Sequence, residues 1–426
     1  MAVRKIPPKK SVQKNKTARR STNGAKVAPA RTVSKVKKVQ YKGGKRPTRR
    51  TGGLIGWFRS DRAAGEVDYT FMLLVGVLVA FGLIMLLSAS TPTADVKFGR
   101  SYHFFLRQFV FVVLGAILMF GLSYIDYRKW KPYARKFMIL CLVLLGLVFI
   151  PGIGVEHNGS RRWINLVVME FQPSELAKLA VSMFFAALVE DKIWDVTKKD
   201  GLIKYGMWIG AIAALMLAET HLSGTIVLCG IAVCILLVAG ASLKPIFIAG
   251  GTALAGLGLF AYLDPVRSAR ITSFLNPFAD KQASGYQTVQ SLYAIGSGGI
   301  FGKGLGESVQ KFSYLPEPYN DFIFAVTCEE LGLIGAAFII ALFAGLIIRG
   351  FKIATEADDV FGSLMVVGIM AQVSIQTILN IAVATSSMPN TGVSLPFFSY
   401  GGTAIMILLA EMGIVLSVSR YSGKRK

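Results

Sequence analysis

Long apolar runs, separated by short polar breaks, constrain the fold of this chain more than any other feature of its sequence. Most of the runs hold roughly 17 to 25 residues, and about 20 helical residues cross the hydrocarbon core of a bilayer. Each run therefore predicts one membrane-spanning helix. The expected spans are 69–90, 103–125, 137–150, 174–189, 204–218, 224–240, 245–262, 322–348, 362–385 and 400–419.

The composition excludes an ordinary soluble domain. Hydrophobic residues make up 53% of the 426 residues, charged residues only 17%, and the mean hydropathy is +0.53. A soluble fold cannot bury so much apolar surface. We therefore expect an all-α integral membrane protein with about ten transmembrane helices and a large extracellular loop between spans seven and eight. Because the third and fifth runs are short, nine spans are the alternative.

The net charge of +23 arises at the amino terminus. Residues 1–50 hold eighteen of the 47 Lys and Arg residues and no Asp or Glu, so the remainder is nearly balanced. Such a polar, basic segment lacks the apolar residues for a core. A polybasic segment next to a span is attracted to the anionic cytoplasmic leaflet, and we favour that interpretation over nucleic-acid binding.

The distribution of the other basic residues predicts the orientation. With the amino terminus inside, the loops expected on the cytoplasmic side are the richer in Lys and Arg, so both termini should be cytoplasmic. The predicted parts are a disordered basic cytoplasmic tail over 1–53, an interfacial amphipathic helix over 54–66, a membrane domain over 67–420 and a short basic carboxy terminus over 421–426.

The first cluster of chemical interest runs from residue 158 to residue 179 and ends in FQPSELAKL. Pro173 and Glu175 suit the first turn of a well-capped helix. Capping does not explain Lys178, because a charge within an apolar run is costly and marks a functional site. Glu175 and Lys178 are three residues apart and share a helix face. We predict that this face is polar and contacts substrate.

Two adjacent arginines precede that helix. Arg161 and Arg162, followed by Trp163, lie on the expected outer side, against the positive-inside trend. They are either snorkelling cations beside an interfacial tryptophan or a clamp for pyrophosphate, since Arg binds phosphate oxygens in a bidentate manner. The chemistry of the residues alone leaves both interpretations open.

The second cluster, QSLYAIGSGGIFGKGLGES, lies in the long loop 263–321. A nucleotide-binding loop is excluded because Ser297 stands five residues before Gly302, and Gly304 follows Lys303, so the pattern GxxxxGK[ST] fails. The glycines instead predict a bent, closely packed re-entrant loop. No zinc signature is present, the four cysteines fall within apolar runs, and the three histidines are far apart in the sequence.

The third and fourth clusters flank the last spans. Asp321 is expected at the outer start of the eighth span, where it is either a helix cap or a functional carboxylate. Glu329 and Glu330 follow about two turns deeper, so we expect a row of carboxylates facing a polar cavity. The sequence NTGVSLPFFSYGG, residues 390–402, interrupts apolar sequence, and broken backbone at membrane depth lines protein or a cavity.

At these four clusters the chain resembles the SEDS family, which includes FtsW, RodA and the sporulation homologue SpoVE. The residues that carry the resemblance are RRWINL with FQPSELAKL, QSLYAIGSGGIFGKGLG, LPEPYNDFIFAVTCEELGLIGA and NTGVSLPFFSYGG, in that order. The resemblance covers roughly residues 66–420 and is greatest to the FtsW branch of Gram-positive bacteria, with RodA next. The segment ETHLSGT, which contains His221, departs from the family pattern.

The resemblance implies a peptidoglycan glycosyltransferase that polymerises lipid II outside the cytoplasmic membrane, with Asp321 as the catalytic residue and general base. It also implies a class B penicillin-binding protein as partner, other divisome membrane proteins, and a location at the division septum. With the residue chemistry above, it gives a predicted substrate-binding set: Arg161, Arg162, Trp163, Gln172, Ser174, Glu175, Lys178, Asn320, Glu330, Ser394 and Tyr400.

Two further matters stay open at this stage. The pyrophosphate charge that develops in such a reaction needs Arg, Lys or a divalent cation such as Mg²⁺ or Mn²⁺. A RodA-type elongation polymerase and a lipid II flippase are the alternative functions, but a transporter usually shows internal repeats, and none is evident between the two halves.

Overall fold

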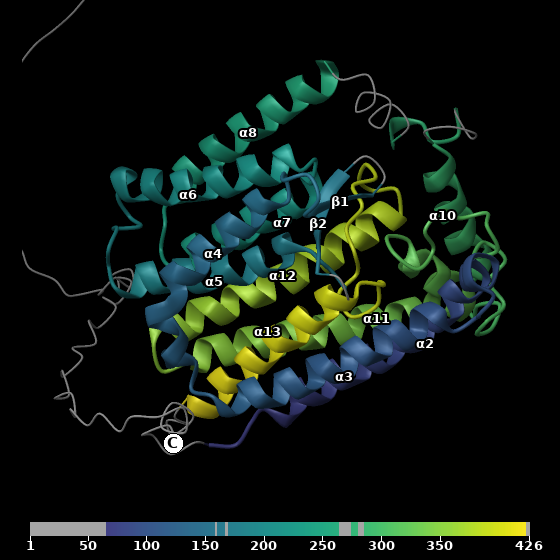
Figure 1. Cartoon of the computed structure of the whole chain (residues 1–426), viewed down its shortest axis with the longest axis horizontal. Coiled ribbons are helices and arrows are strands. Elements are labelled where there is room, and N and C mark those ends of the chain that lie inside the picture. The colour runs from purple at the N-terminus through teal and green to yellow at the C-terminus, as the bar shows by residue number, and fades with distance from the viewer. Residues whose placement is uncertain (1–64, 158–159, 167–168, 264–273, 280–284, 423–426) are drawn as a thin grey trace, which may run out of the picture. The chain divides into compact units, whose positions relative to one another are not determined.

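The computed structural model describes residues 65–157, 160–166, 169–263, 274–279 and 285–422. Within them, each predicted span coincides with one helix (Figure 1). These helices are α2 (Tyr69–Phe98), α3 (His103–Tyr124), α4 (Ala134–Leu147), α5 (Pro173–Glu190), α6 (Lys199–Ala218), α7 (Leu222–Val238), α8 (Leu243–Leu263), α11 (Ile323–Glu356), α12 (Val360–Ala384) and α13 (Gly402–Tyr421). The helical membrane fold is confirmed.

The number of spans stays a prediction. Six of the described helices, namely α2, α3, α6, α11, α12 and α13, are long and apolar enough to cross a membrane. The predicted tail over 1–53 and nearly all of the predicted interfacial helix over 54–66 lie outside the described residues, as do the last four residues.

The loops expected on the outer side contain elements that we did not predict. Loop 151–173 forms an antiparallel sheet in the order β1 (Gly154–His157), β2 (Ser160–Asn165) and β3 (Glu170–Phe171). The long loop before α11 contains α10 (Tyr286–Gly298), which packs against α11. On the side expected to be cytoplasmic, a short 3₁₀ helix, η1 (Tyr127–Tyr133), precedes α4. These elements are short or polar, so hydropathy gives little signal for them.

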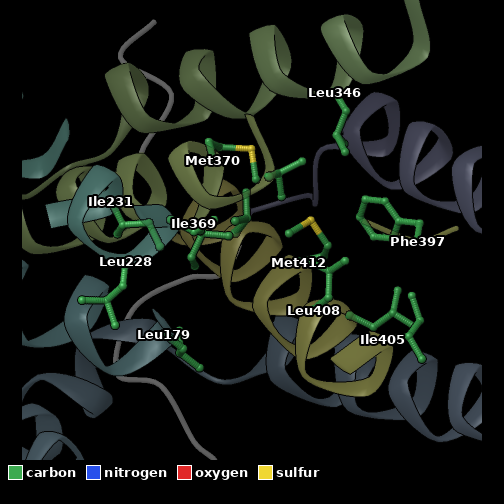
Figure 2. Close-up of a cluster of buried hydrophobic side chains, with 14 of the residues drawn as sticks. Leu179, Leu228, Ile231, Leu346, Ile369, Met370, Phe397, Ile405, Leu408 and Met412 are labelled. Carbon is green, nitrogen blue, oxygen red and sulfur yellow. The ribbon is translucent and has the colours of Figure 1, made fainter. Parts of the chain in front are cut away.

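The core lies where α5, α7, α11, α12 and α13 meet. Figure 2 shows buried side chains from these helices, among them Leu179, Ile231, Leu346, Ile369 and Met412. In contrast, α3 and α6 are strongly apolar but mostly exposed. In a membrane protein, such apolar exposed faces contact lipid, because lipid tails solvate them as well as a protein core does.

Small residues bring α3 and α13 close together (Figure 1). A Cβ atom built on Gly402 would lie 2.3 Å from the ring of Phe111, and one on Gly413 would lie 2.5 Å from the carbonyl oxygen of Met119. Glycine is therefore required at these points for the two backbones to approach. The contact places the start of α13 beside α3, where both helices reach the candidate site.

The glycine-rich segment before residue 305 binds to a break in α11. Gly332 interrupts that helix with φ +66° and ψ −168°. The N–H groups of Lys303 and Gly304 donate to the carbonyls of Glu329 and Glu330, each at 3.0 Å. The loop thus satisfies backbone groups that the break would otherwise leave unpaired. This agrees with the predicted bent, closely packed loop.

The two glutamates of α11 hold the same loop through their side chains. Glu329 accepts a hydrogen bond from Lys303 Nζ at 2.6 Å, and Glu330 pairs with Lys311 Nζ at 2.9 Å. Lys311 also donates to Ser88 Oγ of α2 at 2.9 Å. The expected row of carboxylates facing a cavity is therefore corrected: Glu329 and Glu330 are turned toward the loop, where lysines neutralise their buried charges.

We predict that Gly332→Ala destabilises the protein by about 1–3 kcal/mol. Its backbone is left-handed, and a Cβ atom there would lie 2.3 Å from Gly302 N and 2.5 Å from the carbonyl oxygen of Ile300. Gly76→Ala is the control, because the space around this helical glycine is open and alanine favours helix. Thermal unfolding in detergent should show a loss for the first variant alone; equal stability would contradict the proposed role of the break.

Candidate functional site

A cavity of about 800 Å³ lies where several segments distant in sequence come together. Its walls are formed by the ends of α2 and α3, by β2 with the start of α5, by the segment leading into α11, and by the segment 390–405. These are the ends of the helices that carry the loops expected on the outer side. The volume is within the range of small-molecule sites.

The cavity gathers most of the residues that the sequence singled out. Nine of the twelve predicted site residues line it, namely Arg162, Trp163, Gln172, Glu175, Lys178, Asn320, Asp321, Ser394 and Tyr400. Arg161, Ser174 and Glu330 are not among its lining residues. Glu330 belongs to the ion pair with Lys311 described above.

Asp321 lies two residues before the start of α11. The N-cap position of α11 is Phe322, and no side chain caps this helix, so the structure does not support helix capping as the reason for the aspartate. Asn380 Nδ2 donates both to the carbonyl of Asp321 at 2.8 Å and to that of Val393 at 2.7 Å. One amide of α12 thus fixes the backbone of the aspartate against the segment 390–401.

The space beside the Asp321 carboxylate depends on Gly392. This glycine has φ +66°, and a Cβ atom on it would lie 3.1 Å from Asp321 Oδ2. Burial in the cavity raises the pKa of Asp321 to about 6, the charge of Glu317 adds to the rise, and Arg162 opposes it. A carboxylate with a pKa near the working pH suits a general base.

The two arginines of β2 have different partners. Arg161 Nε donates to Glu156 Oε2 of β1 at 2.9 Å, and both side chains are about half exposed. Arg162 instead donates from its guanidinium to the carbonyl of Thr220 at 2.6 Å and lines the cavity. Successive residues of a strand point to opposite faces, so only Arg162 is placed to meet a ligand in the cavity.

Lys178 and Glu175 form the predicted pair. Lys178 Nζ lies 2.7 Å from Glu175 Oε2, and the lysine side chain is only 2% exposed. Near them, Gln372 Nε2 donates to Glu411 Oε2 of α13 at 3.0 Å, and Gln372 lines the cavity. Sequence reasoning missed Glu411, although a fully buried acidic residue in an apolar run is the kind of signal that identified Lys178.

The loop between α6 and α7 also reaches the site. His221 lines the cavity, and burial, with help from Arg162 and Lys178, lowers its pKa to about 3, so the ring is neutral. Burial raises the pKa of the adjacent Glu219 to about 8. Neither residue was predicted for the site, because His221 marks a departure from the family pattern.

Aromatic and cationic residues of α2 and α3 complete one wall and were also missed. Phe104 stacks on Tyr319 with ring centroids 4.7 Å apart, and Tyr400 lies edge-on to both rings. Lys97 and Arg107 line the cavity on the same side. In the sequence Lys97, Phe104 and Arg107 look like ordinary interfacial side chains, so no pattern distinguished them; Tyr400 alone was predicted.

The described residues bring no three His, Cys, Asp or Glu side chains together in a way that would hold a metal ion. The cations that the chain itself supplies at the cavity are lysine and arginine side chains.

Known proteins resemble the chain over this whole region. Stage V sporulation protein E of Bacillus subtilis is 42% identical over 83% of the chain and 97% of its own length. A probable peptidoglycan glycosyltransferase FtsW of Geobacter metallireducens is 39% identical over 83% of the chain and 94% of its own length.

Solved structures share the fold. A peptidoglycan synthase complex, described as coordinating polymerization and crosslinking, matches with a TM-score of 0.71 and 28% identity over 84% of the chain and 99% of its own. The rod shape determining protein RodA of Thermus thermophilus matches with a TM-score of 0.63 and 27% identity over 84% of the chain and 98% of its own. The model of the cell cycle protein family FtsW/RodA/SpoVE matches residues 68–424, and the chain belongs to this family.

Proposed function

We propose that the chain is a peptidoglycan glycosyltransferase that polymerises lipid II into glycan strands at the outer face of the cytoplasmic membrane, as an FtsW-type enzyme of cell division. The observation that carries the proposal is the Asp321 carboxylate, which lies in one cavity with Arg162 and Lys178. Relatives named as probable peptidoglycan glycosyltransferases support it.

In the proposed reaction the 4-hydroxyl oxygen of an acceptor sugar attacks the anomeric carbon of a donor. Asp321 accepts the hydroxyl proton as the new C–O bond forms. The bond between the anomeric carbon and the phosphate oxygen breaks, and undecaprenyl pyrophosphate leaves with the electron pair. Arg162 is the cation that acts electrostatically on Asp321, so it is placed to stabilise the charge that develops on the leaving group.

The subtype and the partners belong to the same proposal. A class B penicillin-binding protein would supply the transpeptidase, and other divisome membrane proteins would place the enzyme at the septum. The solved synthase complex that couples polymerization to crosslinking supports a partnered enzyme. RodA-type elongation is the alternative. Expression of the chain in cells depleted of their division polymerase, and in cells depleted of their elongation polymerase, shows which of the two it replaces.

A lipid II flippase is the alternative from another functional class. It would use the same charged cavity but would form no glycosidic bond. Incubation of the purified protein with lipid II, alone and with a class B penicillin-binding protein, decides the question. Glycan strands would support the polymerase, and translocation into vesicles without strand formation would overturn it.

Asp321→Asn should lower the rate of polymerisation by roughly 10² to 10⁴, because the shape is kept and the base is lost. Asp321→Ala should be similarly inactive, since the side chain caps no helix. Asp95→Asn is the matched control: it makes the same chemical change on the end of α2, but residue 95 does not line the cavity. Strand formation by a well-folded Asp321→Asn protein would refute the assignment.

The pH dependence should follow the pKa of Asp321. The base acts only when ionised, so the rate should fall about tenfold per pH unit below about pH 6, rather than below pH 4 as for an exposed aspartate. Because Glu317 raises this pKa and Arg162 lowers it, Glu317→Gln should move the acid limb to lower pH and Arg162→Gln to higher pH. Initial rates from pH 4.5 to pH 8 test this prediction, and an acid limb unmoved by both changes would contradict it.

Lys178→Met should impair polymerisation more than Lys178→Arg, because only arginine keeps a cation beside Glu175. If the pair were merely structural, methionine would be harmless or stabilising, since it removes a buried charge. Turnover at equal membrane abundance, with thermal stability measured in parallel, distinguishes the two roles. Full activity of the Met variant would show that the charge is dispensable.

A further inference from the structure

The loop between α6 and α7 has a backbone conformation that β2 holds in place. Thr220 has a left-handed φ of +58°, which is uncommon for a residue other than glycine. Its carbonyl accepts a hydrogen bond from the Arg162 guanidinium at 2.6 Å, and its hydroxyl donates to Ser160 Oγ at 2.8 Å. Such strained backbone persists where the surrounding structure fixes it, and it clusters at functional sites. After this turn, His221 and the start of α7 line the cavity.

The start of α7 is open to a ligand. Ser223 and Gly224 of its first turn line the cavity. Among the described residues, no side chain caps this helix, no acidic residue lies in its first turn, and no group accepts a hydrogen bond from the N–H of Ser223 or Gly224. Unpaired N–H groups and the partial positive charge of a helix N-terminus favour an anion. Many helices share this property, so a second feature is needed to identify a site.

The side chain of His221 provides that second feature. It is only 7% exposed and lines the cavity, and its Nδ1 atom has no hydrogen-bond partner among the described residues. Leaving a buried polar atom unpaired costs free energy, so such an atom at a cavity wall indicates a ligand. The ring packs closely on Gly224, where a Cβ atom would lie 2.5 Å from Cε1 and 2.8 Å from Nδ1. The position of the ring therefore requires glycine at residue 224.

The charges around this site favour a negative ligand. Arg162 is hydrogen-bonded to the residue that precedes His221, and the positive charges of Arg162 and Lys178 help to keep the ring neutral. A neutral imidazole has one N–H, which Nδ1 can donate to an anion. The acidic residue of the same loop, Glu219, does not line the cavity. Burial raises the pKa of Glu219 to about 8, so its carboxyl carries a proton at neutral pH and does not repel an anion.

Contacts connect this site to the Asp321 carboxylate through Gly392. Ser223 Oγ donates to the carbonyl of Gly392 at 3.4 Å. On the other side, a Cβ atom on Gly392 would lie 3.1 Å from Asp321 Oδ2. In a direct displacement, the attacking oxygen and the leaving oxygen lie on opposite sides of the reacting carbon. The reaction proposed above therefore needs an anion site that is close to the base but not in contact with it, and the start of α7 meets this requirement.

We propose that the uncapped N-terminus of α7, His221 and Arg162 together bind the phosphate group that leaves in the reaction. The N–H groups of Ser223 and Gly224 and the Nδ1–H of His221 donate to phosphate oxygens, while Arg162 supplies positive charge. The inference rests on the proposed function for the identity of the anion, a lipid-linked pyrophosphate. It adds the α6–α7 loop to Arg162, which was assigned above to the leaving group.

Binding of undecaprenyl pyrophosphate to the purified protein, in nanodiscs of zwitterionic lipid, tests the site without requiring catalysis. His221→Phe keeps a flat ring and removes the donor. It should weaken binding about tenfold or more, the size expected for losing a hydrogen bond to a charged group. His221→Asn should retain much of the affinity, because its amide N–H replaces that of Nδ1. His103→Phe is the matched control and should have no effect, since His103 does not line the cavity.

Two further changes act on the helix terminus itself. Ser223→Asp adds a negative charge at the start of α7 and should weaken binding more than Ser223→Asn, which has the same shape without the charge. Gly224→Ala should displace the His221 ring and weaken binding as well. Gly210→Ala on α6 should leave binding unchanged, because the space around this glycine is open. Thermal unfolding recorded in parallel restricts the comparison to folded variants.

The outcomes separate the anion site from the proposed function. Absence of binding to the unchanged protein, or binding that neither His221→Phe nor Ser223→Asp weakens, would overturn the site even if the protein polymerises lipid II. Displacement by phosphatidylglycerol at equal concentration would assign the site to membrane headgroups and would overturn it too. Binding that depends on His221, in a protein that forms no glycan strands, would support the site and refute the proposed function.

Discussion

The side-chain amide of Asn380 donates hydrogen bonds to two backbone carbonyls, each in a different non-helical segment. The arrangement of the site depends on this interaction. One of the two carbonyls is that of Asp321 before α11, and the other is that of Val393 before α13. At membrane depth, a backbone group without a partner has no water to replace it. The irregular segments that carry the candidate site residues therefore persist only where the helices around them supply hydrogen bonds.

The same constraint explains the architecture around the cavity. The break at Gly332 is completed by the glycine loop, and Ser399 Oγ donates to the carbonyl of Asn320 at 2.6 Å. Buried carboxylates of α11 are neutralised by Lys303 and Lys311 from the loop. Residues that resemble substrate ligands in the sequence thus divide into two sets. One set builds a rigid frame, and the other is left facing the cavity.

Charge within the cavity is balanced but unevenly placed. Four cationic and four acidic side chains line it, among the described residues. Glu175 neutralises Lys178, whereas Asp321 has its carboxylate in the cavity and its pKa raised by burial. Such an arrangement favours a ligand that brings its own negative charge together with sugar hydroxyls. The substrate proposed above, a lipid-linked saccharide pyrophosphate, would bring both.

The sequence by itself determined the helical membrane fold, and it singled out most of the predicted residues that line the cavity. Apolar runs locate the ten helices because the bilayer imposes a length on each of them, and Lys178 stands out because charge is costly there. The span count, the domain limits and the orientation stay predictions.

Only the tertiary structure decided which of these residues share a cavity. Sequence chemistry left Arg161 and Arg162 equivalent, but strand alternation sends one to Glu156 and the other to Thr220. It placed Glu330 in a row with Asp321, whereas the break at Gly332 and Lys311 turn that carboxylate toward the loop. The physical reason is that hydropathy and motif spacing report on single segments. A site is made by contacts between segments. These contacts depend on glycines that let two backbones approach and on the ion pairs that buried charges form.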